Sequence, residues 1–183
     1  PQDNRTAVLF TQELSRGSKG PHHRVPYHAG VCFTWKKALF MTIQTVGIIG
    51  AGTMGNGIAQ ACAVSGINVV MVDISDAAVQ KGLATVAGSL DRLIKKEKIT
   101  AADKDAALAR IKTSTSYDDL KAAQLVIEAA TENYELKLKI LKQVDAIVAP
   151  EVIVASNTSS ISITKLAAAT SRADRFIGMH FFN

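Results

Sequence analysis

The most informative stretch of the sequence is Val46-Gly-Ile-Ile-Gly-Ala-Gly-Thr-Met-Gly-Asn-Gly-Ile-Ala-Gln60. It opens on an apolar run typical of a buried strand, breaks at Gly50, Gly52 and Gly55, and resumes with helix-forming residues. Strand, G-x-G-x-x-G and helix in this order are the context that a dinucleotide-binding turn requires. The first glycine permits a tight turn, the second lets the backbone approach a pyrophosphate, and the third lets the helix press against the sheet. The stretch therefore predicts a phosphate site at a helix N-terminus.

An acidic residue follows the next apolar run at the expected distance. Residues 69–72 are typical of a buried strand, and Asp73 stands directly after them. In dinucleotide-binding folds an acid about 20 residues after the glycine motif accepts the adenosine ribose hydroxyls. No Arg follows Asp73 directly to hold a 2′-phosphate, so the sequence favours NAD over NADP. The alternative is a glycine-rich turn in an unrelated α/β protein.

Strands and helices are expected to alternate along the rest of the chain. The expected strands are 43–49, 68–72, 111–114, 124–128, 152–155 and 176–181, and the expected helices are 53–65, 76–98, 101–110, 132–149 and 163–169. Asp76 is the expected N-cap of the long helix, and Thr100 with Asp103 resembles a capping pair. Strands separated by helices indicate right-handed crossovers. We therefore predict an α/β fold of the Rossmann type, doubly wound, with a mainly parallel sheet and helices on both faces.

The N-terminal stretch differs from the rest of the chain. Residues 1–41 hold six Lys and Arg against two acids, whereas the remainder holds fifteen against fourteen, so the net charge of +5 arises mostly from this stretch. We expect residues 1–41 to be an extension outside the fold and 42–183 to form the dinucleotide-binding domain. The basic charge is therefore no sign of a nucleic-acid partner. The histidines between Pro21 and His28 stand among prolines, which favours an irregular segment over a metal site.

The remaining composition is that of an ordinary globular protein. Hydrophobic residues make up 48% of the chain and charged residues 20%. Cys32 and Cys62 form no disulfide framework, which fits a reduced, cytoplasmic setting. No apolar run approaches the length of about 20 residues that a membrane span needs, so no membrane partner is expected.

Five motifs in order carry a resemblance to a known family. They are Gly50-Ala-Gly-Thr-Met-Gly-Asn-Gly-Ile-Ala-Gln60, Ser89-Leu-Asp-Arg-Leu-Ile-Lys-Lys96, Glu128-Ala-Ala-Thr-Glu-Asn133, Ser156-Asn-Thr-Ser-Ser160 and Gly178-Met-His-Phe-Phe-Asn183. Together they resemble the NAD-binding domain of the 3-hydroxyacyl-CoA dehydrogenases over residues 42–183. The resemblance implies NAD-dependent oxidation of a short-chain (S)-3-hydroxyacyl-CoA to the 3-oxoacyl-CoA, in fatty acid or butanoate metabolism.

The resemblance also assigns roles residue by residue. His180 matches the catalytic base, and Ser159 matches a serine that touches both the nicotinamide and the substrate oxygen. Ser89 and Lys96 match contacts to coenzyme A and fall on one helix face because they are seven residues apart. The implied NAD-binding residues are Gly50, Ala51, Gly52, Thr53, Met54, Gly55, Asp73, Glu132, Lys137, Ser159 and Asn183. A histidine suits the role of base because it titrates near neutral pH.

Each assignment has a structural alternative, and so does the activity. His180 could be a core histidine, Ser159 a helix N-cap, and Lys96 part of a solvated face. In the family, a glutamate that orients the base and a helical, dimerising C-terminal domain follow the last motif. We therefore expect this chain to be a fragment that keeps NAD binding and is inactive alone, from a homo-oligomeric enzyme. The alternatives are a non-catalytic dinucleotide-binding module and an NAD dehydrogenase of another substrate.

Overall fold

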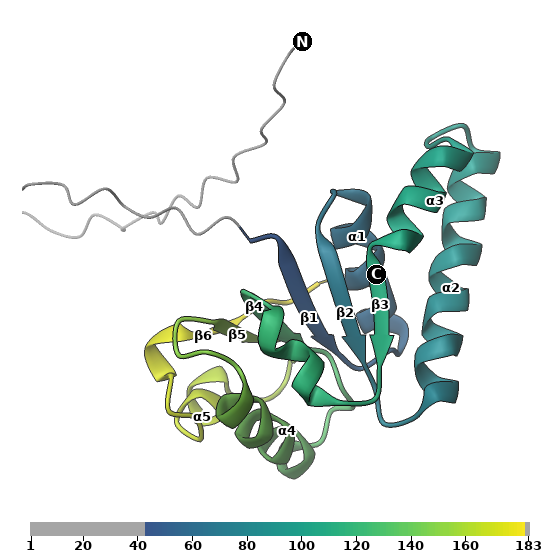
Figure 1. The fold of residues 1–183 in the computed structure, drawn as a ribbon. Coiled ribbons are helices and arrows are strands. Elements are labelled where there is room, and N and C mark those ends of the chain that lie inside the picture. The colour runs from purple at the N-terminus through teal and green to yellow at the C-terminus, as the bar shows by residue number, and fades with distance from the viewer. Residues whose placement is uncertain (1–42, 182–183) are drawn as a thin grey trace, which may run out of the picture. The chain divides into compact units, whose positions relative to one another are not determined.

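A six-stranded parallel sheet forms the centre of the computed structural model, which describes residues 43–181 (Figure 1). The strand order is β3-β2-β1-β4-β5-β6. The strands are β1 (Thr45–Ile49), β2 (Asn68–Val72), β3 (Ile111–Ser114), β4 (Leu125–Glu128), β5 (Ile153–Ser156) and β6 (Phe176–Gly178). The helices are α1 (Thr53–Val64), α2 (Asp76–Lys95), α3 (Ala101–Ala109), α4 (Tyr134–Ile147) and α5 (Ile163–Ala167), with 3₁₀ turns η1 (Tyr117–Ala122) and η2 (Ala173–Arg175). The predicted fold class is confirmed.

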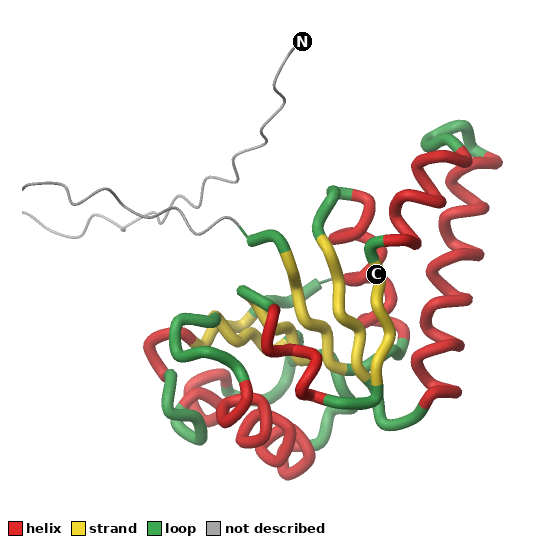
Figure 2. Tube along the Cα trace, in the orientation of Figure 1, coloured by secondary structure: helices red, strands yellow, loops and turns green. Residues whose placement is uncertain are grey.

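Both faces of the sheet are apolar and both are covered by helices (Figures 1 and 2). Side chains alternate along each strand, so neighbours in sequence point to opposite faces. Ile48 of β1 packs in a cluster with residues of α1, α2 and α3. Ile49, the next residue, packs in a second cluster with residues of η1, α4 and α5. Burial on two faces explains why the strands are continuous apolar runs rather than alternating ones.

Predictions made for the N-terminal stretch lie outside the described residues. They concern the extension 1–41, Cys32 and the histidines between Pro21 and His28. Among residues 43–181, no helix is long and apolar enough to cross a membrane.

Several predicted helix and strand ends were wrong, and side-chain caps explain where α2 and α4 begin. The Ser75 hydroxyl, not Asp76, accepts a hydrogen bond from Ala78 N at 3.2 Å and caps α2. The same helix ends at Lys95, before Glu97 takes a positive φ of 55°. The expected capping pair of Thr100 and Asp103 is present at the start of α3.

The predicted ranges of α4, α5 and β6 were also too long, and that of β5 was displaced by one residue. α4 begins at Tyr134 because the Asn133 side chain accepts from Leu136 N, and this leaves Glu132 in the loop before the helix. α5 is capped by Ser162. β6 ends at Gly178, after which Phe181 N donates to the Asn157 side chain rather than to a neighbouring strand.

Two glycines set the geometry of the turn between β1 and α1. Gly50 has a φ of +101°, a conformation that residues with a Cβ rarely adopt. A Cβ on Gly55 would collide with the carbonyl of Gly50. The turn therefore packs backbone on backbone, as the spacing of the glycine motif predicts.

Arg172 forms hydrogen bonds with carbonyl groups at and after the C-terminal end of α4. Its guanidinium donates to the carbonyls of Ala149 at 2.7 Å, Val152 at 3.2 Å and Val148 at 3.1 Å. It also donates to the Asp145 carbonyl at 2.9 Å and to the Asp145 carboxylate at 2.6 Å. The last carbonyls of a helix lack partners within the helix, and this arginine supplies hydrogen-bond donors for them.

We expect Asp145→Asn to lower the free energy of unfolding by about 1.5–3 kcal/mol at neutral pH. Burial alone would raise the pKa of the Asp145 carboxyl, but hydrogen bonds from Arg172 and Ser171 and the Arg172 charge outweigh it and hold the pKa below its ordinary value. A depressed folded-state pKa stabilises the protein above the unfolded pKa of about 3.9, and this stabilisation disappears as pH falls through the folded pKa. Urea unfolding should show the difference between variant and wild type at pH 7 and its decline below about pH 4.

Candidate functional site

Two pockets open beside the glycine turn, at the carboxyl ends of the strands. The chain leaves β1 toward β2 and later returns to place β4 on the other side of β1. In open parallel sheets ligands bind in the crevice that such a reversal creates. The larger pocket has a volume of about 250 Å³ and the smaller one about 200 Å³. Ala129 and Ala130, directly after β4, line both, so the two pockets adjoin.

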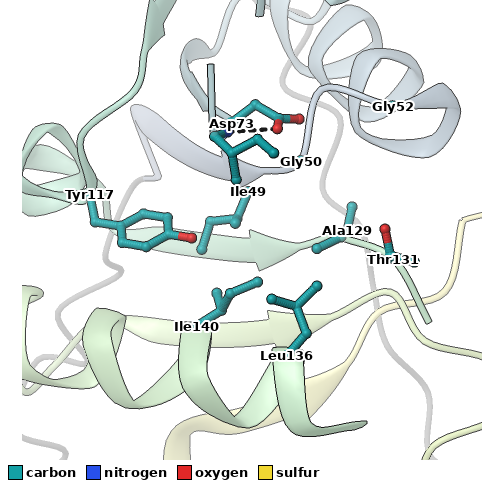
Figure 3. A pocket seen from close by; sticks show the side chains of 11 residues that line it. Ile49, Gly50, Gly52, Asp73, Tyr117, Ala129, Thr131, Leu136 and Ile140 are labelled. Carbon is teal, nitrogen blue, oxygen red and sulfur yellow. Dashed lines mark hydrogen bonds between the residues drawn. The ribbon is translucent and has the colours of Figure 1, made fainter. Parts of the chain in front are cut away.

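The larger pocket combines one carboxylate with apolar walls (Figure 3). Asp73 lies on one side and the α4 side chains Leu136 and Ile140 on another. The full lining is Ile49, Gly50, Gly52, Asp73, Ile74, Tyr117, Ala129, Ala130, Thr131, Leu136 and Ile140, with no Lys or Arg among these residues. A carboxylate between apolar walls fits an adenosine, whose ribose donates hydrogen bonds and whose base offers a flat apolar face.

Asp73 is held in place by the backbone. Its carboxylate accepts a hydrogen bond from Ala51 N at 2.6 Å and another from Ile74 N at 2.7 Å. Asp73 therefore anchors the glycine turn in addition to facing the pocket. Burial, followed by the charges of Asp73 and Glu128, raises the pKa of the Tyr117 phenol, so Tyr117 stays protonated at neutral pH.

The N-terminus of α1 suits a phosphate. Ser75, Thr100, Asn133 and Ser162 give α2, α3, α4 and α5 a side-chain cap, whereas Gly52 gives α1 none. The first turn of α1 also holds no acid, so no carboxylate of that turn offsets its positive end. A Cβ on Gly52 would meet no atom within 4 Å, which leaves the backbone open on its pocket side. Residues 50–55 therefore fit a pyrophosphate.

The smaller pocket gathers the polar residues predicted for the nicotinamide end. Ser159 and His180 line it together with Glu132 and Lys137, although these residues come from the loops after β4, β5 and β6 and from α4. The other lining residues are Met54, Ala129, Ala130, Asn157 and Thr158. An imidazole, a hydroxyl and charged groups around one small space are groups that can take part in proton transfer.

Glu132 ties the walls of this pocket together. Its carboxylate accepts from Thr158 Oγ1 at 2.7 Å and from Ser159 N at 3.2 Å, and it lies 3.4 Å from Lys137 Nζ. Burial alone would raise the pKa of the Glu132 carboxyl, but the Thr158 hydrogen bond, the Lys137 charge and the Ser159 amide together hold it below its ordinary value. Glu132 is therefore an anion at neutral pH.

The structure brings most of the predicted site residues together. Gly50, Gly52 and Asp73 line the larger pocket, and Met54, Glu132, Lys137, Ser159 and His180 line the smaller one. Ala51, Thr53 and Gly55 belong to the turn and the first residues of α1. Asn183 lies outside the described residues.

The two residues predicted to contact coenzyme A stand apart from the pockets. Ser89 lies in α2, and Lys96 follows the last residue of that helix. At about 1.5 Å per residue, they are roughly 20 and 30 Å along the helix from Asp76. They line neither pocket, and their role stays a prediction.

Sequence reasoning missed two features of the site. Glu128, the last residue of β4, is completely buried and pairs with Lys137 at 2.7 Å. In the sequence it ends an apolar run and opens the motif Glu128-Ala-Ala-Thr-Glu-Asn133, but neither feature assigns it a role. The apolar residues Ile74, Leu136 and Ile140 were not predicted either, since apolar side chains beside a pocket look like core residues in a sequence. Among residues 43–181, no three His, Cys, Asp or Glu side chains gather as a metal site.

Comparison with known proteins agrees with this geometry. The family described as 3-hydroxyacyl-CoA dehydrogenase, NAD binding domain, matches residues 45–183. A 3-hydroxybutyryl-CoA dehydrogenase of Bradyrhizobium diazoefficiens is 51% identical over 141 residues, which are 77% of this chain and 48% of the relative. One from Mycobacterium tuberculosis is 42% identical over 142 residues, covering 77% of this chain and 50% of the relative. The solved structure of (S)-3-hydroxybutyryl-CoA dehydrogenase from Ralstonia eutropha is 83% identical with a TM-score of 0.77, covering 78% of this chain and 50% of that one. The chain thus spans about half the length of these relatives.

Proposed function

This chain belongs to the 3-hydroxyacyl-CoA dehydrogenase family, whose NAD-binding domain it matches, and on that premise we propose that it serves the NAD-dependent oxidation of an (S)-3-hydroxyacyl-CoA. A substrate of the size of 3-hydroxybutyryl-CoA is favoured by the names of its relatives. The observation that carries the proposal is the meeting of His180 and Ser159 in a pocket that adjoins the pocket of Asp73. The pathway we propose is fatty acid or butanoate metabolism.

The two pockets fit the two halves of the cofactor. Asp73 would accept the ribose hydroxyls of the adenosine half, and the N–H groups at the start of α1 would face the pyrophosphate. Glu132 and Lys137 would line the ribose at the nicotinamide end. When bound, the nicotinamide supplies the acceptor for a hydride.

The chain's own residues would handle the proton. Oxidising a secondary alcohol releases a proton from oxygen as the hydride leaves carbon, so a base must stand near the hydroxyl. We assign that role to His180, and we assign to Ser159 a hydrogen bond that orients the substrate oxygen. Ser89 and Lys96 remain the proposed contacts for coenzyme A, and Asn183 a proposed polar contact at the nicotinamide.

The chain should bind NADH at least about tenfold more tightly than NADPH, because the 2′-phosphate would face the Asp73 carboxylate as a like charge. Asp73→Ala should weaken NADH binding and narrow the preference for NADH over NADPH. It removes the acceptor for the ribose hydroxyls, and it also removes the acceptor for Ala51 N in the glycine turn. Fluorescence titration with the two cofactors measures both effects. Asp76→Ala, an exposed acid three residues on, is the matched control and should change neither affinity. Equal affinities in the wild type would contradict the role of Asp73.

Turnover tests the activity itself. The chain is joined after Asn183 to the C-terminal half of the Ralstonia eutropha relative, and acetoacetyl-CoA reduction is followed by NADH absorbance. We expect turnover by the fused protein that requires both acetoacetyl-CoA and NADH. NADH binding without turnover would instead favour a non-catalytic dinucleotide-binding module.

A further inference from the structure

A chain of polar contacts begins at the buried Glu128 and runs to Glu132, which is 44% exposed and lines the smaller pocket. Glu128 is the last residue of β4 and stands opposite Ser156 of β5 in the sheet register. Its carboxylate is completely buried and accepts from Ser156 Oγ at 2.6 Å, Ala130 N at 2.7 Å and Lys137 Nζ at 2.7 Å. Buried carboxylates that accept several hydrogen bonds hold their neighbours rigidly.

Lys137 connects Glu128 to residues that line the smaller pocket. The side chain is 1% exposed, and its ammonium group also donates to Ala130 O at 3.1 Å and lies 3.4 Å from Glu132 Oε2. Ala130 is therefore held at both its N–H and its carbonyl, by Glu128 and Lys137 respectively. Since Ala130 lines both pockets, the wall between them depends on this pair.

Glu132 connects Lys137 to the loop after β5. Its Oε1 atom accepts from Thr158 Oγ1 and Ser159 N, while its Oε2 atom faces Lys137. The contacts thus run from Glu128 through Lys137 and Glu132 to Ser159, which lines the smaller pocket with His180. Glu128 itself lines neither pocket.

From this geometry we infer that Glu128 is a positioning residue for the nicotinamide end of the cofactor. Acting through Lys137 and Glu132, it fixes the loops after β4 and β5 at the spacing that the smaller pocket needs. The adenosine end shares the wall at Ala130, but its polar groups, Asp73 and the backbone at Gly52, are held by β2 and by the glycine turn and contact none of these residues. The inference rests on the proposed function, since it concerns the same cofactor site.

The test compares two ligands on one variant. ADP carries the adenosine and the pyrophosphate but lacks the nicotinamide and its ribose. In Glu128→Gln, which keeps the shape of the side chain and removes its charge, we expect the dissociation constant for NADH to rise at least about tenfold and that for ADP to stay within about twofold. The fluorescence of bound NADH, which reports the surroundings of the nicotinamide, should shift toward that of NADH in water.

A matched control separates positioning from loss of stability. Asp145 and Arg172 form another ion pair that is largely shielded from water, with side chains 15% and 5% exposed, and neither lines the two pockets. Asp145→Asn should lower the melting temperature while leaving both dissociation constants unchanged. If Asp145→Asn also weakens NADH binding but not ADP binding, then lost stability alone explains the result for Glu128→Gln, and the inference is overturned.

A second variant decides the matter if Glu128→Gln does not fold. Ser156→Ala removes one donor to Glu128 at 2.6 Å, together with a longer contact of 3.4 Å from Thr158 N, and Ser156 itself lines neither pocket. It should raise the dissociation constant for NADH at least about threefold and leave that for ADP unchanged. Wild-type NADH affinity in a folded Glu128→Gln, or in Ser156→Ala, overturns the positioning role alone. A wild-type chain that binds neither NADH nor ADP would instead overturn the proposed function.

Discussion

Replacing His180 by alanine is expected to slow acetoacetyl-CoA reduction by the fused protein about 10²- to 10⁴-fold, the range that a positioned general acid or base contributes. Reduction reverses the oxidation, so the group that takes the proton in one direction returns it in the other. His180 stands on the exposed side of the smaller pocket, whereas the glycine turn and Asp73 lie elsewhere along the cleft. NADH affinity should therefore stay within about threefold, since lost acid–base catalysis lowers kcat without removing ground-state binding.

Added imidazole gives this experiment its matched control. If the alanine variant lacks only a base, free imidazole should restore part of the rate by entering the vacated space. His180→Phe removes the same base but fills the space, so imidazole should not rescue it. A wild-type rate in His180→Ala, or equal rescue of both variants, would contradict the role proposed for His180.

The fold was predictable because its signals are local. The glycine motif, Asp73 and the apolar runs each lie within one short stretch, and the alternation of strands and helices leaves few possible topologies. Helix ends were harder to predict, since a serine and an aspartate stand side by side at residues 75 and 76 and both are good caps. Only the hydrogen bond from Ala78 N to Ser75 distinguishes them.

The buried contacts behind the smaller pocket could not be predicted from local signals. Glu128 meets Lys137 nine residues later and Ser156 another nineteen residues beyond. The pairing of β4 with β5 brings Glu128 beside Ser156, and the packing of α4 on the sheet brings Lys137 to Glu128. In the sequence, Glu128 ends an apolar strand and opens one of the five motifs, but nothing there points to its two partners. The resemblance led to Glu132, Lys137, Ser159 and His180, which line one pocket, while their individual roles stay predictions.

Lys137→Met is expected to lower the free energy of unfolding by about 3–5 kcal/mol, because it leaves a buried carboxylate without its counter-ion. Lys137 Nζ and Glu128 Oε1 lie 2.7 Å apart, with side chains 1% and 0% exposed. Methionine keeps an unbranched apolar stem that ends one atom short of the lysine nitrogen, so little of the loss should come from packing. Urea unfolding at neutral pH measures the change, provided that the slope with denaturant is unchanged.

Lys121 offers a control ion pair of the same length. Its ammonium group also lies 2.7 Å from a carboxylate, that of Asp118, but the two side chains are 63% and 69% exposed. Lys121→Met should change stability by no more than about 0.5 kcal/mol, since water screens exposed pairs and solvates the carboxylate left behind. Adding Glu128→Gln to Lys137→Met should recover much of the loss, because a neutral pair needs no counter-ion. Equal effects of Lys137→Met and Lys121→Met would mean that Glu128 reaches water, and its role as a fixed point beneath the pocket would then be wrong.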